Sequence, residues 1–262
     1  MEPQPPSPPF PASSALKTIA KYKQRSFDTS LNSHIPLLES AKNPSSPDVV
    51  LIGDSMIERM LTTANCGPNL VSPWPSQTML PKDNSKQFQA GRVLNLGVGG
   101  DKIQNVAYRL VGDPTQCLKS VADMLAARRS VKLWVLQVGT NNLSPKKGLG
   151  DGDVDALRAL VEALLDIGAE GCKVLVTGLF LRKDIPWEKI KQANEKIRQV
   201  VENFASGHPA SVLWLPATEE VKEEHLVDHV HLSEAGYKIW IGRSLADETM
   251  RVWVMAECTA KD

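Results

Sequence analysis

The chain has 262 residues, enough to bury one large α/β core, and length alone would allow one domain or two. Its 30 basic and 30 acidic side chains cancel, and no run of Lys or Arg is long enough to follow a phosphate backbone, so nucleic acid is not an expected partner. No segment has the apolar length of a membrane span, and the first residues lack the apolar stretch of a signal peptide. We therefore expect a cytoplasmic protein.

The four cysteines are scattered along the chain and form no C-x-x-C pair. This spacing predicts neither a zinc site nor a disulfide framework. Reduced thiols in a cytosolic protein are the simpler interpretation. The residues concerned are Cys66, Cys117, Cys172 and Cys258.

The first 14 residues are rich in Pro and Ser and cannot build a packed core. We expect the folded part to start between Ala15 and Ser30, and we divide the chain into a disordered tail over residues 1–27 and one folded domain over residues 28–262. A helical stretch around residues 31–41 then leads through a turn-rich bridge into the first strand. A later segment, rich in Pro, Asn, Ser and Lys, predicts a surface insertion near residues 63–90.

Five short β-rich runs follow the bridge, and each is apolar almost throughout. Strands of this composition are typical of a parallel sheet that is buried on both faces. Helical patterns alternate with the runs, which predicts a doubly wound, three-layer α/β/α fold around a five-stranded parallel sheet. The runs are Val49 to Ile52, Val93 to Leu96, Leu133 to Val138, Val174 to Thr177 and Val212 to Leu215.

Amphipathic patterns predict the helices between these strands. After the second strand, apolar residues recur at helical spacing from Ile103 to Leu110, and Asp101 is a plausible N-cap for that helix. Trp134 and Trp240 lie within apolar patterns and are expected in the core. The longer helical patterns cover residues 154–167, 188–204 and 233–255.

Ser55 follows the first strand after only Gly53 and Asp54, and a helical pattern comes next. At such a strand-to-helix turn, a hydroxyl lies near the unpaired N–H groups of a helix start, which favour a developing oxyanion. An ordinary helix cap is the alternative, because Ser and Asp are common N-caps. The sequence is not G-x-S-x-G, which argues against the nucleophile elbow of α/β-hydrolases.

Small or polar residues also follow the second and third strands. Gly97, Gly99 and Gly100 allow a ligand to approach closely, and the N–H of Gly100 can point into the crevice, although a structural tight turn explains them equally. A dinucleotide-binding loop is disfavoured because Lys102 stands where its third glycine should be. After the third strand, Asn141 offers an amide that can donate to an oxyanion without titrating, but turn chemistry also accounts for it.

Asp228 and His231 are three residues apart, just before a predicted helix. One turn can hold this carboxylate near the imidazole, where it fixes the tautomer and stabilises the imidazolium. A metal site is the alternative because His225 and His229 are close by, but Leu226 replaces the Glu of an H-E-x-x-H zincin. We therefore expect no metal and place His225 and His229 either at the surface or next to the residues of the site.

Taken together and in this order, the blocks resemble the SGNH hydrolases, also called GDSL-type esterases. Within that family, IGDSMIERM, LGVGGDKIQNVAYRL, VGTNN and the block from Asp228 to Ser233 look most like the intracellular platelet-activating-factor acetylhydrolase group. The resemblance covers roughly residues 28–250. It implies a flavodoxin-like fold, hydrolysis of short acyl esters such as acetyl esters of lipids, no cofactor and a homodimer.

The resemblance also implies roles for five residues. Ser55, Gly100, Asn141 and His231 match the four residues of the family's name, with Asp228 as the acid. Ser55 is then the nucleophile and His231 the general base. The N–H groups of Ser55 and Gly100 and the Asn141 amide form the oxyanion hole.

Two other functions remain open on the same residues. A carbohydrate O-deacetylase has this machinery beside a sugar-lined groove. A non-catalytic binding or scaffold subunit keeps the fold without the reaction, but the presence of all five site residues argues against that alternative. Candidates for the acyl pocket, for each of which packing is also an adequate explanation, are Leu143, Leu179, Phe180 and Leu226.

Overall fold

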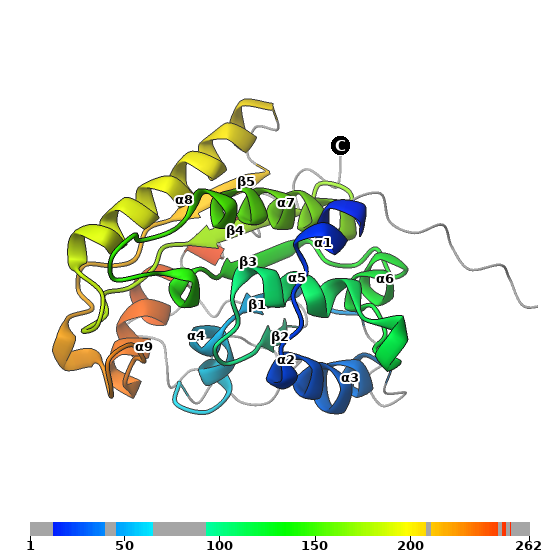
Figure 1. Cartoon of the computed structure of the whole chain (residues 1–262), viewed down its shortest axis with the longest axis horizontal. Helices are drawn as coiled ribbons and strands as arrows, with labels where there is room; N and C mark the ends of the chain where they lie inside the picture. Colours follow the sequence, from blue (N-terminus) through cyan, green and yellow to red (C-terminus); the bar gives the residue numbers. More distant parts are fainter. Residues whose placement is uncertain are drawn as a thin grey trace, which may run out of the picture.

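A parallel β-sheet runs through the middle of the molecule, with helices over both of its faces (Figure 1). The computed structural model describes residues 13–39, 46–64, 93–207, 211–245, 248–249 and 252. Within these ranges the sheet has five strands in the order β2-β1-β3-β4-β5, and every neighbouring pair is parallel. The predicted three-layer α/β/α architecture is confirmed.

Each strand begins and ends within one residue of its predicted run. Every residue of β1 to β4 is buried, which explains why these runs are apolar throughout, whereas the edge strand β5 is partly exposed in its middle. The strands are β1 (Val49–Gly53), β2 (Val93–Gly97), β3 (Leu133–Gln137), β4 (Lys173–Thr177) and β5 (Val212–Leu215).

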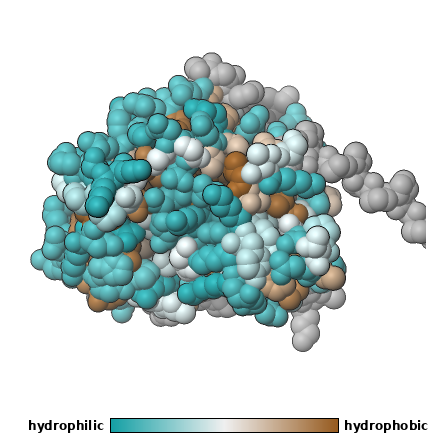
Figure 2. Space-filling model, in the orientation of Figure 1, coloured by the Kyte–Doolittle hydropathy of each residue, from teal (hydrophilic) through white to brown (hydrophobic). Residues whose placement is uncertain are grey.

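Alternate residues of the strands enter two separate apolar cores, one on each face of the sheet. Ile52 and Trp134 belong to the larger core, and Leu51 belongs to the smaller one, where Trp240 also packs. Both tryptophans are buried as predicted. The molecular surface seen in Figure 2 is correspondingly hydrophilic over most of its area.

The two cores are covered by different helices. The smaller core lies beneath α4 (Ser55–Glu58) and α9 (Glu234–Trp240). The larger core lies beneath α5 (Ile103–Val111), α6 (Val121–Ala126), α7 (Asp151–Ile167) and α8 (Trp187–Gly207). Among the helices of the described ranges, none is long and apolar enough to cross a membrane.

The helical stretch predicted around residues 31–41 is a succession of three segments. α2 (Gln24–Thr29) runs into a π-helical turn (Ser30–His34), which continues as α3 (Ile35–Glu39). Pro36 gives the physical reason, because it has no N–H and its ring would clash with the carbonyl four residues earlier. A wider π-turn just before the proline accommodates both effects.

The predicted boundary at residue 28 lies too late in the chain, because the fold begins near the early end of the predicted range from Ala15 to Ser30. α1 (Ser13–Ile19) and α2 are helices, and Leu16 and Ser26 are fully buried. Leu16 packs into the larger core, so the folded domain begins well before residue 28. Composition describes only the local sequence, and the partners of Leu16 come from elsewhere in the chain. Residues 1–12 lie outside the described ranges.

Two other predictions fall partly outside the described residues. The insertion near residues 63–90 is described only at residues 63 and 64. The last predicted helix, 233–255, is α9 followed by a π-helical turn over Ile241–Leu245, with little of the remainder described. Of the four cysteines, Cys117 and Cys172 are described, and both are free thiols.

The predicted N-cap of α5 is also wrong. Lys102 occupies the N-cap position, and its N–H is bonded by the Asn105 side chain at 2.9 Å. Asp101 is instead fully buried, with its carboxylate bonded to Arg109 and to the Ser26 hydroxyl. Its charge is matched inside the fold, so the carboxylate does not cap the helix.

Candidate active site

The blocks that follow β1, β2 and β3 meet at the carboxyl edge of the sheet. Gly53, the last residue of β1, pairs with Gly97 of β2 and with Gln137 of β3. The loops after these strands therefore leave the sheet at the same level, where open α/β sheets bind their ligands. The segment with Asp228 and His231 follows β5 and reaches back to this edge.

Ser55, His231 and Asp228 form a continuous chain of side-chain contacts. Ser55 Oγ lies 2.9 Å from His231 Nε2, and His231 Nδ1 lies 2.7 Å from Asp228 Oδ2. The fold thus joins two residues that are 176 positions apart. An imidazole that contacts a hydroxyl through one ring nitrogen and a carboxylate through the other has the geometry needed to activate that hydroxyl as a nucleophile.

Asp228 organises the loop that carries the histidine. Its Oδ1 accepts the N–H groups of Val230 at 2.8 Å and His231 at 2.7 Å, which leaves Oδ2 for the imidazole. Burial alone would raise the pKa of Asp228, but the hydrogen bonds from His231 and Val230 outweigh it and hold that pKa well below its ordinary value. The carboxylate is therefore charged at neutral pH and can stabilise an imidazolium.

At the turn before α4, Asp54 and Ser55 make different contacts. Asp54 is the N-cap of α4, because its side chain accepts the Met56 N–H at 2.9 Å. Ser55 is only 6% exposed, and its hydroxyl contacts His231 instead of capping the helix. A Cβ atom at Gly97 would lie 2.2 Å from the Glu58 nitrogen, so a glycine is needed there for α4 to approach β2.

The carboxyl group of Asp54 is itself perturbed. The pKa of Asp54 is raised to about 7, mainly by its complete burial and in part by the nearby charge of Asp101, against the opposing hydrogen bond from the Met56 N–H. Near neutral pH this carboxyl is partly protonated. A charged Asp54 carboxylate would repel an oxyanion formed at Ser55. Protonation of Asp54 reduces this repulsion.

Gly100 and Asn141 lie on the loops beside Ser55. Gly100 has a φ of +75°, in the left-handed region that favours glycine. Its N–H has no hydrogen-bond acceptor among the residues that the structure describes. The Asn141 amide nitrogen donates to the Asp101 carbonyl at 3.0 Å and lies 3.4 Å from Asp54 Oδ2, so Asn141 contacts both neighbouring loops.

A buried charged cluster behind these loops was missed at the sequence level. Arg109 Nε lies 2.8 Å from Asp101 Oδ2, and both side chains are almost completely buried. Arg109 also reaches the Gly53 carbonyl at 3.3 Å, at the end of β1. Ser26 Oγ donates to Asp101 Oδ1 at 2.5 Å. The available signal was Arg109 itself, an arginine three residues after Val106 on the apolar side of the predicted helix.

The other two histidines of this region take different positions. His229 is 56% exposed, as predicted, with Nε2 3.9 Å from Asp184. His225 is partly buried, and its Nδ1 accepts the Lys222 N–H at 2.9 Å. In the part of the chain that the structure describes, no three His, Cys, Asp or Glu residues are grouped to hold a metal ion.

The four candidates for an acyl pocket all take part in packing. Leu179 is buried in the larger core, against which Leu143 also packs, whereas Phe180 and Leu226 are buried in the smaller core. Phe180 makes an edge-to-face contact with Trp240 at a centroid distance of 5.0 Å. Packing therefore accounts for each of these side chains.

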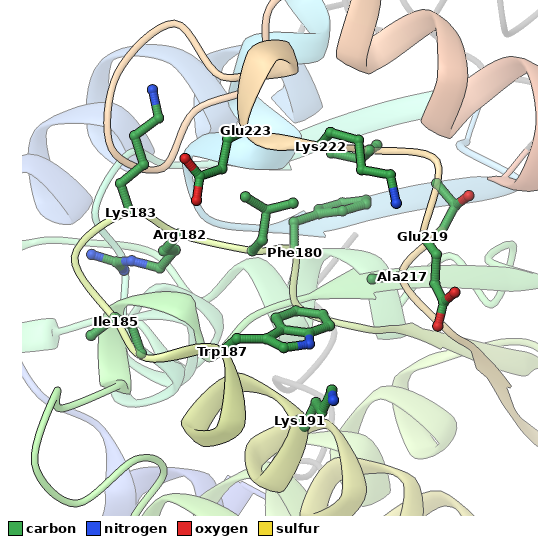
Figure 3. A pocket seen from close by; sticks show the side chains of 13 residues that line it. Phe180, Arg182, Lys183, Ile185, Trp187, Lys191, Ala217, Glu219, Lys222 and Glu223 are labelled. Atoms are coloured by element: carbon green, nitrogen blue, oxygen red, sulfur yellow. The ribbon is translucent and has the colours of Figure 1, made fainter.

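A cavity of about 530 Å³ opens at the same edge of the sheet, beyond the histidine loop. Phe180, Trp187 and Lys222 are among the side chains that surround it (Figure 3). Its wall is tied to the histidine loop, because the Lys183 N–H donates to the His229 carbonyl at 2.8 Å. Ser55 and His231 do not line this cavity.

Comparison with known proteins identifies the family. Residues 51–239, well over half of the chain, match the sequence model of the GDSL-like lipase/acylhydrolase family. The chain belongs to this family. As a GDSL-type, or SGNH, acylhydrolase it is a carboxylic ester hydrolase, and the predicted resemblance is confirmed.

Individual relatives of this GDSL-type hydrolase agree with that assignment. Platelet-activating factor acetylhydrolase IB subunit alpha1 of Rattus norvegicus is 27% identical over 196 residues, which cover 73% of this chain and 70% of the relative. The Homo sapiens subunit alpha1 is 25% identical over 197 residues, covering 73% and 71%.

Two solved structures share the fold. A protein of Streptococcus pneumonia described as a platelet activating factor has a TM-score of 0.51 and 18% identity, covering 90% of this chain and 97% of its own. A family two carbohydrate esterase of Clostridium thermocellum has a TM-score of 0.54 and 11% identity, covering 78% and 64%.

Proposed function

We propose that this GDSL-type hydrolase is a serine esterase that removes short acyl groups, above all acetyl groups, through an acyl-enzyme. The observation that carries the proposal is the unbroken contact chain from Asp228 through His231 to Ser55. A hydroxyl, an imidazole and a charged carboxylate in this order are the parts of a serine hydrolase triad. Membership of an acylhydrolase family supports ester hydrolysis independently.

The reaction begins when Ser55 Oγ attacks the ester carbonyl carbon and His231 Nε2 takes the hydroxyl proton. Asp228 holds the tautomer in which Nδ1 carries a proton and stabilises the imidazolium that forms. The tetrahedral oxyanion is held by the N–H groups of Ser55 and Gly100 and by the Asn141 amide. His231 then returns the proton to the leaving alkoxide, which departs and leaves an acyl group on Ser55.

Deacylation repeats these steps with water as the nucleophile. His231 takes a proton from the water as it attacks the acyl carbonyl, and returns that proton to Ser55 Oγ as the ester bond breaks. The products are a carboxylic acid and the free enzyme. Apart from water, this route uses only side-chain and backbone groups of the chain itself and requires no cofactor or metal.

Acetylated lipids are the proposed substrates. The supporting observation is the similarity to proteins named platelet-activating factor acetylhydrolase IB subunits over about three quarters of the chain. A cytoplasmic location and a homodimer accompany this proposal, on the resemblance to the same group. Acetylated oligosaccharides are the substrates that would distinguish a carbohydrate O-deacetylase, and comparing kcat/KM on the two classes decides between them.

The direct test compares the wild-type protein with Ser55→Ala on p-nitrophenyl esters from acetate to octanoate. We expect activity confined to short chains, and a loss in kcat of about 10⁴-fold or more in the variant. Covalent labelling with a fluorophosphonate should occur in the wild-type protein and be lost in Ser55→Ala. Thermal unfolding of the variant checks that the fold is intact. Turnover by Ser55→Ala close to that of the wild type would contradict the proposal.

A further inference from the structure

We propose that Lys23 is a positioning residue, which aims the N–H of Gly100 at the substrate oxyanion and strengthens it as a hydrogen-bond donor. This inference rests on the proposed function. Its basis is one contact: Lys23 Nζ donates to the carbonyl oxygen of Gly99 at 2.8 Å. The Gly99 carbonyl and the Gly100 N–H belong to the same peptide unit.

The planarity of that unit transmits the contact. In a trans peptide the C=O and N–H bonds point in opposite directions, and the group moves as one rigid plane. Anchoring the Gly99 oxygen on one side therefore directs the Gly100 N–H to the other side. This agrees with the finding that the Gly100 N–H has no acceptor among the described residues.

A peptide between two glycines needs such an anchor. Without Cβ atoms at Gly99 and Gly100, the unit can rotate through conformations that other residues could not adopt. A flipped peptide would present its carbonyl oxygen where the donor is required, and that oxygen would repel an oxyanion. The charge-assisted hydrogen bond from Lys23 opposes the flip, because the flipped state would lose it.

The ammonium group also acts on the strength of the donor. A cation bound to a peptide oxygen draws electron density away from the nitrogen end, as in any chain of hydrogen bonds that polarise one another. The Gly100 N–H then carries more positive charge toward the developing oxyanion. The arrangement is in place before the reaction, so no reorganisation is required in the transition state.

Lys23 is itself held by contacts on both sides. Its ammonium lies 3.4 Å from Asp101 Oδ1, inside the cluster with Arg109 and Ser26, and its side chain remains 30% exposed. Lys21, two residues before Lys23, is bound to α5, because its N–H donates to the Gln104 carbonyl at 3.0 Å. The backbone that carries the Lys23 ammonium group is therefore held in place against α5.

The same geometry shows how closely Lys23 approaches the loop. A Cβ atom added at Gly100 would lie 2.9 Å from Lys23 Nζ. A second link joins the segment to the nucleophile side, since Arg25 forms an ion pair at 2.9 Å with Glu58 in the helix that begins at Ser55. This N-terminal segment lies outside residues 51–239, where the family match falls.

The test is kinetic and uses three variants of the full chain. Lys23→Met keeps the apolar stem and removes the charge, Lys23→Arg keeps the charge, and Lys17→Met makes the same change on an exposed lysine of α1. With p-nitrophenyl acetate we expect Lys23→Met to lower kcat by about 10- to 100-fold, less than the 10²- to 10³-fold cost of deleting an oxyanion donor. KM should change by less than about threefold, because the loss falls on the transition state.

Two further measurements distinguish a positioning role of Lys23 from a purely structural role. The affinity for a trifluoromethyl ketone, which forms a tetrahedral adduct with the serine, should fall by the same factor as kcat. Lys23→Arg should recover most of the activity, and Lys17→Met should match the wild type.

Each remaining outcome overturns the inference. A kcat for Lys23→Met within twofold of the wild type, with Ser55→Ala inactive, would leave the esterase intact and remove the role of Lys23. If Lys23→Met only raised KM or lowered the Tm, with kcat and the inhibitor affinity unchanged, the role of Lys23 would also be excluded. A wild-type protein that neither hydrolyses esters nor labels at Ser55 would overturn the proposed function, and this inference with it.

Discussion

The loop that carries the histidine and the loops that carry the proposed oxyanion donors are held in different ways. Asp228 and His231 contact each other within three residues of chain, and their side chains are 39% and 21% exposed. Asp101, next to Gly100, is fully buried, and its carboxylate is bonded by Ser26, 75 positions away, and by Arg109. The Asn141 amide reaches the same residue across 40 positions.

This difference separates chemistry from stability. A partly exposed pair closed by one turn contributes less to folding than a buried pair does, so a change there acts mainly on the reaction. A buried ion pair has lost its water, so removing one partner leaves an uncompensated charge in the core. Variants of the histidine loop should therefore change kcat without changing stability, and variants of the buried cluster should change stability first.

The largest expected effect comes from Asp228→Asn. Its Oδ1 can still accept the backbone N–H groups of the loop, but an amide facing Nδ1 favours the wrong tautomer of His231. We expect kcat to fall by about 10⁴-fold, with thermal unfolding nearly unchanged. The matched control is His229→Ala, an exposed residue of the same loop, which should keep kcat within about twofold. An Asp228→Asn enzyme with more than a tenth of normal turnover would contradict this assignment.

Arg109→Met should have the next largest effect, on the free energy of unfolding. Among the described residues, loss of the guanidinium leaves the Asp101 carboxylate with Ser26 and the more distant Lys23 as side-chain partners. We expect a destabilisation of about 3 kcal/mol in urea unfolding, and partial recovery when Asp101→Asn is added. Arg158→Met removes an exposed ion pair and should cost less than about 1 kcal/mol. Equal costs for Arg109→Met and Arg158→Met would erase the contrast between the two regions.

The smallest effect concerns Asp54 and depends on pH. Burial raises its pKa from 3.8 to about 7, so the folded state binds the proton more tightly than the unfolded state does. Its contribution to stability is therefore present at low pH and is lost as pH rises from about 4 to about 7. Asp54→Asn removes this dependence while keeping an acceptor for the Met56 N–H.

The measurement is the Tm difference between Asp54→Asn and the wild type at pH 5 and pH 8. We expect the variant to gain relative stability at pH 8, by roughly 2–4 °C for each kcal/mol of linkage. The control is Asp123→Asn, which changes an exposed carboxylate. Its Tm difference from the wild type should not grow between pH 5 and pH 8. A Tm difference for Asp54→Asn that shrinks toward pH 8 would reverse the sign of the linkage and contradict the raised pKa.

Local patterns in the sequence determined the sheet and the positions of the reactive side chains. A strand buried on both faces is apolar throughout, whichever strands lie beside it. For this reason all five strands were predicted to within one residue. Asp228 and His231 form their contact inside one turn, which is also a property of local sequence. Ser55 was found because it lies at a predicted strand-to-helix turn, and the other blocks, taken together with it, favoured a nucleophile over an ordinary helix cap.

Tertiary structure alone decided what surrounds those side chains. Asp101 was predicted to cap a helix, because its true partners, Ser26 and Arg109, become neighbours only when α2 and α5 pack together. The start of the fold was placed at residue 28 because composition cannot show that Leu16 has a place in the core or that Lys23 reaches Gly99. The physical reason is the same in each case: burial and charge pairing depend on residues far apart in the chain, and only the folded structure brings those residues into contact.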